Sequence, residues 1–197
     1  MNAPRSYRLG QRAISAGATR DAIIAATLDA LTRRPIAELT LEKIASLAGC
    51  SVRTVIRHMG SRDRAVDLAL TSVLTEAEHE NPDAWRTVDD ALHSIVDHYT
   101  RRGALVWSIL SQENSEPRFA GLAQIGRGMH LHEARRIVQL HDERLTNDEH
   151  LVELVSVVTD ITTWHLLVTA HSKTPREAGE AMRRIVQAVL TSEEAKP

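Results

Sequence analysis

Residues 41–68 read LEKIASLAGCSVRTVIRHMGSRDRAVDL, and this stretch decides the fold. Apolar side chains recur in it at the i, i+3, i+4, i+7 spacing of a helix face, in two sets. The sets are Leu41, Ile44, Ala45 and Ala48, then Val52, Val55, Ile56 and Met59. Gly49 lies between them and can take the left-handed conformation that ends a helix, and Ser51 can cap the next helix. The stretch therefore predicts a helix-turn-helix with both apolar sets turned inward.

The outer face of the predicted second helix is polar and carries no acid. It presents the side chains of Arg53, Thr54, Arg57 and His58. Arginine can pair bidentately with guanine, and threonine can bond a base edge or touch the methyl group of thymine. Because the second helix of a helix-turn-helix lies in the major groove, these four residues are predicted to read DNA. The alternative is a solvated basic face on an ordinary helical hairpin.

Residues flanking the two helices are placed to contact the DNA backbone. Thr40 lies at the cap position before the first helix of the helix-turn-helix. Its hydroxyl and the free amides of that helix can hold a phosphate. The alternative is that Thr40 serves only as a cap. Ser61 can cap the helix that follows, and arginines in its first turn are available to phosphates. The predicted backbone contacts are Thr40, Ser51, Arg62 and Arg64.

The segment before this stretch predicts one supporting helix, which Thr19 can cap and Pro35 ends. Its apolar stripe consists of Ile23, Ile24, Leu28 and Leu31. Residues 1–18 predict a flexible basic arm, which either contacts a minor groove or is simply a loose chain start; its arginines are Arg5, Arg8 and Arg12. The DNA-binding domain is then expected over residues 19–65, with a connecting helix to about residue 78.

The same residues carry a family resemblance. The stretch AGCSVRTVIRHMGSRDRAVDL, after TLEKIAS, resembles the DNA-binding domain of the TetR/AcrR family of bacterial transcriptional regulators. Upstream, TRDAIIAATLDALTRRP resembles the first helix of that family, so the strong resemblance covers residues 17–70. TTWHLLVTAHSKTPREAGEAMRRIVQAVL resembles the last two helices of many members in layout. The resemblance implies an all-α repressor that binds a palindromic operator as a homodimer and is released by a small-molecule effector.

Three positions depart from the family pattern. Ile56, Met59 and Arg62 stand where the family usually has tyrosine, phenylalanine and lysine. Met59 is apolar like the usual phenylalanine, and Arg62 is positively charged like the usual lysine. The family's tyrosine commonly offers its hydroxyl to a DNA phosphate, which Ile56 cannot do. That contact is therefore either missing or supplied by Arg57 or His58.

The rest of the chain predicts a helical bundle. Helical patterns cover residues 86–101, 104–114, 118–142, 147–171 and 175–191, with breaks at Gly103, Pro117, LTND and KTP. No strand alternation competes, and short links between helices imply antiparallel neighbours. The fold class expected is all-α, with a helix-turn-helix domain followed by a bundle over residues 79–197 for ligand binding and dimerisation.

The last two predicted helices are the most apolar. One has a continuous stripe made of Ala178, Ala181, Met182, Ile185, Val186, Val189 and Leu190. The other contains LVELVSVVTDITTWHLLV, which is apolar on more than one face. Burial against the bundle on one side and against a second chain on the other explains this pattern, so a homodimer is predicted. The alternative is a core helix of a monomer.

An effector would bind between the helices of this bundle. The candidate ligand-binding residues are Trp107, Met129, Asp160, Trp164 and His165, with Phe119 near the mouth of the site. Large apolar side chains at helical spacing are more often core residues than ligand contacts. Asp160 lies among valines and isoleucine, so if buried it needs a partner, either a neighbouring Thr, His or Arg or a cationic effector.

Composition and charge agree with a DNA-binding protein. The 197 residues are 43% apolar and 25% charged, which suits one or two compact domains. Residues 1–64 contain 11 basic and 5 acidic residues, a formal charge of +6, whereas the remaining 13 basic and 21 acidic residues give −8. The basic end can displace counterions from DNA, and the acidic remainder should face away from it.

Other function classes find little support. The chain lacks an enzyme signature, such as the G-x-S-x-G or H-E-x-x-H motif, a phosphate-binding loop or a Rossmann fingerprint, so neither catalysis nor a cofactor is expected. His130 and His132 point to opposite sides of a helix, so no metal site is expected. Neither a signal peptide nor a membrane span is expected, and a single cysteine suits a reducing compartment, so the protein is predicted to be cytoplasmic.

Two interpretations from different classes remain. The first is a ligand-responsive repressor that binds double-stranded DNA. The second is a dimeric helical interaction module that keeps this fold but has lost specific operator binding, with Ile56 as a symptom. Binding to a palindromic duplex separates them.

Overall fold

The computed structural model describes residues 5–78 and 81–194, and side chains over 16–76 and 81–192. Every regular element in these ranges is helical, and no strand occurs among them. The chain divides into two compact units, Met1–His79 and Glu80–Pro197. The predicted all-α class, with a helix-turn-helix followed by a helical bundle, is confirmed.

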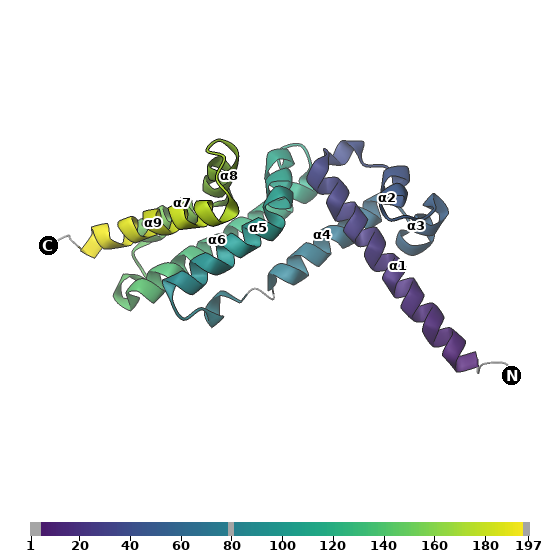
Figure 1. The fold of residues 1–197 in the computed structure, drawn as a ribbon, viewed down its shortest axis with the longest axis horizontal. Coiled ribbons are helices and arrows are strands. Elements are labelled where there is room, and N and C mark those ends of the chain that lie inside the picture. The colour runs from purple at the N-terminus through teal and green to yellow at the C-terminus, as the bar shows by residue number, and fades with distance from the viewer. Residues whose placement is uncertain (1–4, 79–80, 195–197) are drawn as a thin grey trace. The chain divides into compact units, whose positions relative to one another are not determined.

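The first unit is built on the helix-turn-helix (Figure 1). Its elements are α1 (Arg5–Arg33), η1 (Ile36–Glu38), α2 (Leu41–Leu47), α3 (Val52–Met59) and α4 (Arg62–Glu78). α1 packs against α2, α3 and α4, so it supports the other three helices. The core of this unit includes five completely buried residues, Ile23, Leu31, Ile44, Val55 and Val66.

The turn and caps of the helix-turn-helix form as predicted. Gly49 has a φ of +63°, in the left-handed region that a side chain disfavours. Oγ1 of Thr40 accepts a hydrogen bond from the Lys43 amide at 3.2 Å, and Oγ of Ser51 accepts one from the Thr54 amide at 3.1 Å. Oγ of Ser61 accepts from the Arg64 amide at 3.1 Å. Each hydroxyl satisfies an amide that the first turn of a helix leaves free.

α1 differs at its N-terminal end from the supporting helix that the sequence predicts. α1 begins at Arg5, so Thr19 lies inside the helix and the predicted cap there is wrong. Residues 5–18, expected to be a flexible arm, are helical. Residues 1–4 and the side chains of Arg5, Arg8 and Arg12 lie outside the described residues, and their contact with a minor groove stays a prediction.

The second unit is the helical bundle (Figure 1). It consists of η2 (Pro82–Ala84), α5 (Val88–Gln112), α6 (Pro117–His141), η3 (Glu143–Leu145), α7 (Glu149–Thr159), α8 (Ile161–Thr169) and α9 (Pro175–Glu194). α5 packs against α6, α8 and α9, and α7 packs against α6 and α9. Their shared core includes Leu92, Ile137, Val155 and Met182.

Two predicted helix boundaries in this unit are wrong. Gly103 does not interrupt α5, because a glycine weakens a helix without ending it. It lies where α8 crosses: a Cβ at Gly103 would lie 3.5 Å from both Ile161 Cδ1 and Trp164 Nε1. The predicted helix over 147–171 is instead two helices, because Asp160 ends α7 and caps α8.

The stretch Glu149–Thr169 is long and apolar enough to cross a membrane by length and composition alone. Its inward residues Leu151, Val152 and Val155 are completely buried in the bundle core. The break at Asp160 also divides the stretch into two short helices. One side of the stretch therefore packs within the unit, while Val157 and Leu166 remain exposed.

Gly103→Ala is expected to stabilise the second unit by about 0.5 to 1 kcal/mol, because alanine favours the helix and its methyl group fits at ordinary van der Waals distance. Gly179→Ala in α9 is the matched comparison, since its Cβ would approach Val96 Cγ2 to 3.0 Å and the clash should cancel the gain. Urea unfolding of both variants measures the difference. If Gly103→Ala lowered the free energy of unfolding, the space between α5 and α8 at Gly103 would be too small for a methyl group, which contradicts the structure.

Candidate nucleic-acid interface

The predicted reading residues lie on the outer face of α3. Val55 and Met59 are buried, and they anchor the helix to the core of the first unit. Arg53 and Arg57 are exposed, whereas Thr54 and His58 are half-buried. None of the four positions that sequence spacing placed opposite the core is buried, and the two arginines are the more exposed.

Hydrogen bonds on this face order its polar groups. The hydroxyls of Ser51 and Thr54 are 2.9 Å apart, so the cap residue also holds the first threonine of the face. Nη2 of Arg57 donates to Nε2 of His58 at 3.3 Å, which makes that histidine nitrogen the acceptor. Neither Arg53 nor Arg57 forms an ion pair with an acid in the part of the chain that the structure describes. Both guanidinium groups are thus available to an anionic or base-edge partner.

Ile56 is also on the outer face, which contradicts its predicted place in the inner stripe. Its side chain is 47% exposed. Val55 and Met59, four residues apart, define the buried direction, and each helical residue turns about 100° from the one before it. Ile56 is therefore rotated away from the core, next to Arg53 three positions earlier. The i+4 spacing from Val52 concealed this, because Val52 itself is only half-buried.

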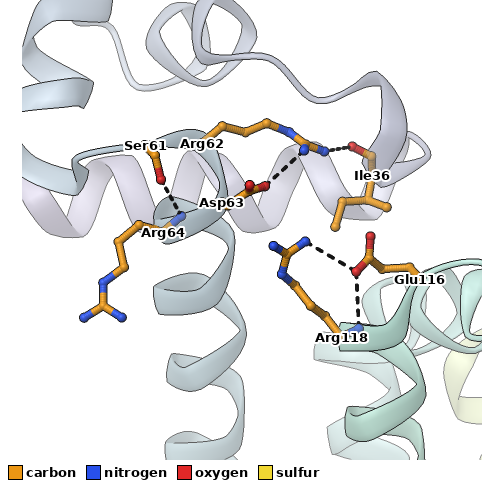
Figure 2. Close-up of polar contacts among 7 residues, drawn as sticks. All are labelled: Ile36, Ser61, Arg62, Asp63, Arg64, Glu116 and Arg118. Carbon is orange, nitrogen blue, oxygen red and sulfur yellow. Dashed lines mark hydrogen bonds and ion pairs between the residues drawn. The ribbon is translucent and has the colours of Figure 1, made fainter.

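Arg62 is turned inward rather than toward solvent (Figure 2). Its Nη2 donates to the carbonyl oxygen of Ile36, and its Nη1 lies 3.1 Å from Oδ1 of Asp63. The guanidinium group thus joins the start of α4 to η1. The guanidinium group is thus already engaged by Ile36 and Asp63, and the contact of Arg62 with a DNA phosphate stays a prediction. Figure 2 shows the Arg64 side chain extending away from these groups, and it remains the predicted phosphate contact of α4.

The N-terminus of α2 already holds a carboxylate. Hydrogen bonds from its own backbone amide and from the Thr40 hydroxyl lower the pKa of Glu42 below its ordinary value. The Thr40 hydroxyl also caps the Lys43 amide. A phosphate at this helix end would compete with the Glu42 carboxylate for the same donors. The role of Thr40 as a cap is established, and its role as a phosphate contact stays a prediction.

Comparison with known proteins adds evidence at the level of fold. No family model matches the sequence, and no curated protein matches it significantly. Among solved structures, the chain is similar to a protein from Rhodococcus sp. that is described as a TetR-family transcriptional regulator. The TM-score is 0.61 at 14% sequence identity, over 87% of this chain and 98% of that one. The chain has the TetR-family fold.

Within this TetR-family fold, the predicted effector residues lie in different environments, and their role in ligand binding stays a prediction. The rings of Trp107 and His165 stack, with centroids 3.7 Å apart and planes at 9°. Trp164 instead belongs to the core, where its ring lies 6.1 Å from that of Tyr99. Met129 is half-buried on α6. The prediction that Phe119 lies near the mouth of a site is wrong, because Phe119 is completely buried.

Asp160 has a partner within the chain. Its Oδ1 accepts hydrogen bonds from the amide of Thr162 at 2.7 Å and from the Thr162 hydroxyl at 2.6 Å. The side chain therefore caps α8 in the TetR-family fold. The sequence left a neighbouring Thr, His or Arg or a cationic effector as possible partners, and the partner present is Thr162. A capping side chain requires no cationic ligand.

The carbonyl oxygens at the helix break near Asp160 accept hydrogen bonds from side chains to which the sequence assigned no such role. A helix end leaves carbonyl oxygens without intrahelical partners, and here three side chains from other elements donate to them. His130 Nε2 donates to the carbonyl oxygen of Ser156 at 2.9 Å, and Thr163 Oγ1 donates to that of Val157 at 2.9 Å. Tyr99 Oη donates to the carbonyl oxygen of Thr159 at 3.1 Å. Burial raises the pKa of Tyr99 well above its usual value, so this hydroxyl stays a donor. No group of three metal-ligating side chains occurs among the described residues.

The contribution of His130 to stability is expected to fall as pH rises. Burial acts to lower the pKa of His130, but hydrogen bonds with Glu133 and the Ser156 carbonyl, and the charges of Glu133 and Asp160, raise it above 6.5 overall. The folded state then binds the proton more tightly than the unfolded state, so the stabilisation is complete below the unfolded pKa and disappears above the folded one. Urea unfolding of wild type and His130→Gln from about pH 5.5 to about pH 8.5 measures this. A stability difference that grows with pH would contradict it.

Proposed function

We propose that this protein is a cytoplasmic, DNA-binding transcriptional regulator rather than an enzyme. The observation that carries the proposal is the outer face of α3, where Arg53 and Arg57 extend from a capped helix-turn-helix without acidic partners among the described residues. Arg53, Thr54, Arg57 and His58 would read base edges. Ser51, Arg64 and the N-terminus of α2 at Thr40 would hold the DNA backbone, with Arg62 supporting them from within.

The distribution of charge supports the same function. Residues 1–64 have a formal charge of +6, and the acidic groups are concentrated in the rest of the chain. A protein that neutralises several phosphates releases their counterions, so its affinity falls steeply with salt. We expect operator affinity to fall by at least about tenfold between 50 mM and 200 mM salt.

We propose further that the protein acts as a homodimer through α8 and α9. One side of the apolar stretch over α7 and α8 is buried in the bundle, while Val157 and Leu166 on the other side are exposed. On α9, Ile185 is exposed although Ala178, Met182 and Val186 are completely buried. These exposed apolar residues would pack against a second copy, and two-fold symmetry would match a palindromic operator.

Regulation by a small molecule is the remaining part of the proposal. The protein would act as a repressor that an effector releases from its operator. Among the predicted ligand-binding residues, Trp107 and His165 are the best placed to touch an effector, because their stacked rings are not enclosed by the core. Trp164 would affect binding only through the packing of the bundle.

The test is a genome-wide selection of DNA bound by the purified full-length chain at low salt. We expect enrichment of one palindromic sequence, with half-sites about one helical turn apart, and a footprint upstream of the protein's own gene or its divergent neighbour. Analytical ultracentrifugation of the protein with and without the duplex gives the number of chains bound. If no sequence were enriched, the operator-binding proposal would be abandoned in favour of a dimeric helical interaction module.

A further inference from the structure

We propose that Ile56 reads the 5-methyl group of a thymine in each operator half-site and so sets the sequence preference of α3. This inference rests on the proposed function, because it requires that α3 enter the major groove. It goes beyond that function in naming both the residue and the chemical group that it recognises. The occupant of this small apolar surface is therefore a base of the operator.

Ile56 lies on the exposed face of α3. Its side chain is 47% exposed on α3, whereas Val55 beside it is completely buried. Arg53 precedes it by three residues and is therefore its neighbour on the helix surface, and Arg57 follows it directly. Any duplex held by these two arginines must meet the Ile56 side chain as well.

The Ile56 side chain is chemically complementary to a thymine methyl group. The major-groove edges of the bases present hydrogen-bond donors and acceptors, and the methyl group of thymine is their one apolar feature. An aliphatic side chain placed against a polar edge would remove water from it without replacing the hydrogen bond. Ile56 cannot bond a phosphate, so its favourable contact in the groove is with a thymine methyl group.

The Ile56 side chain is conformationally restricted before it meets DNA. A β-branched side chain in a helix has one strongly preferred χ1 rotamer, so Ile56 loses little freedom on meeting the base. Burying one methyl-sized group is worth about a fourfold change in affinity. With one contact in each half-site, removing both methyl groups should weaken binding by about 16-fold.

The experiment uses synthetic duplexes of the selected operator and the full-length protein. Each thymine under α3 is replaced in turn by deoxyuridine, which lacks only the methyl group, and Kd is measured by fluorescence anisotropy at fixed salt. We expect one symmetric pair of thymines at which replacing both bases costs the wild type about 16-fold in affinity. Ile56→Ala should bind the thymine and uracil duplexes equally. Replacing the same thymine by cytosine or 5-methylcytosine gives a second test, in which wild type should prefer the methylated base.

The chain offers a matched control. Ile125 on α6 is 48% exposed and lies in the second unit, outside the proposed reading face. Ile125→Ala should keep the full preference for thymine over uracil. Ile56→Val, which keeps the branch at Cβ, should keep part of it, and it serves as the test variant if Ile56→Ala binds too weakly to measure.

The outcomes separate this inference from the proposed function. Failure of the wild-type protein to bind any selected duplex would defeat the proposed function. Tight operator binding with no loss at any uracil, or an unchanged loss in Ile56→Ala, would leave the function intact and overturn the role of Ile56. Circular dichroism melting of Ile56→Ala checks folding, and this exposed position should leave the melting temperature nearly unchanged.

Discussion

Arg57→Ala is expected to weaken operator binding by about 10- to 100-fold while the fold and the oligomeric state are retained. Arg57 is exposed on α3, and its guanidinium group forms no ion pair with an acidic group in the described ranges. A bidentate contact between arginine and a base edge is worth about 1 to 3 kcal/mol of discrimination. Competition binding between the selected operator and a scrambled duplex measures both affinity and specificity.

The matched control for this prediction is Arg33→Ala. Arg33 is an exposed arginine of the same unit that pairs with Asp29 on α1, so its removal changes the net charge equally. It should weaken binding to all duplexes slightly and leave specificity unchanged. If the two variants behaved alike, Arg57 would contribute only charge and would be removed from the reading site. Circular dichroism and ultracentrifugation show whether each variant stays folded and associated.

Trp164→Ala is expected to lower the free energy of unfolding of the second unit by about 3 to 5 kcal/mol. The Trp164 side chain is 6% exposed, and it packs in the bundle core against Tyr99 and close to Gly103. Truncation would remove its apolar contacts and leave a cavity where α8 crosses α5. Urea unfolding followed by circular dichroism measures the loss.

The adjacent residue provides the control. His165 stacks on Trp107 outside the core, so His165→Ala should cost about 1 kcal/mol or less. Trp164→Phe should fall between the two, because it fills part of the cavity. Equal stability of Trp164→Ala and His165→Ala would contradict the core position of Trp164. Any effect of Trp164→Ala on effector response must be measured at a temperature where the variant is fully folded.

The helix-turn-helix could be predicted from the sequence because its determinants are local. The turn depends on one glycine, Gly49, and on the hydroxyls of Thr40 and Ser51, each of which bonds an amide within three residues. The buried direction of α3 follows from the spacing of Val55 and Met59. Short-range patterns of this kind leave a strong signal in one sequence.

The remaining features depend on contacts between distant residues. Gly103 lies within α5 at the point where α8 crosses, and the sequence around Gly103 carries no sign of that crossing. The separation of α7 from α8 depends on donors far away in the sequence, among them Tyr99, which bonds the carbonyl of Thr159 sixty residues later. The inward turn of Arg62 likewise depends on Ile36, 26 residues earlier. Periodicity within one helix carries no information on such partners.

The bond between Arg62 and Ile36 has a mechanical consequence for the reading helix. It joins the segment that precedes α2 to the residue that begins α4, so the chain from 36 to 62 forms a ring closed by a side chain. α2 and α3 are part of this closed segment. This hydrogen bond holds the two ends of the helix-turn-helix segment together, so the start of α4 is tied both to α3 through the chain and to η1 through the Arg62 side chain.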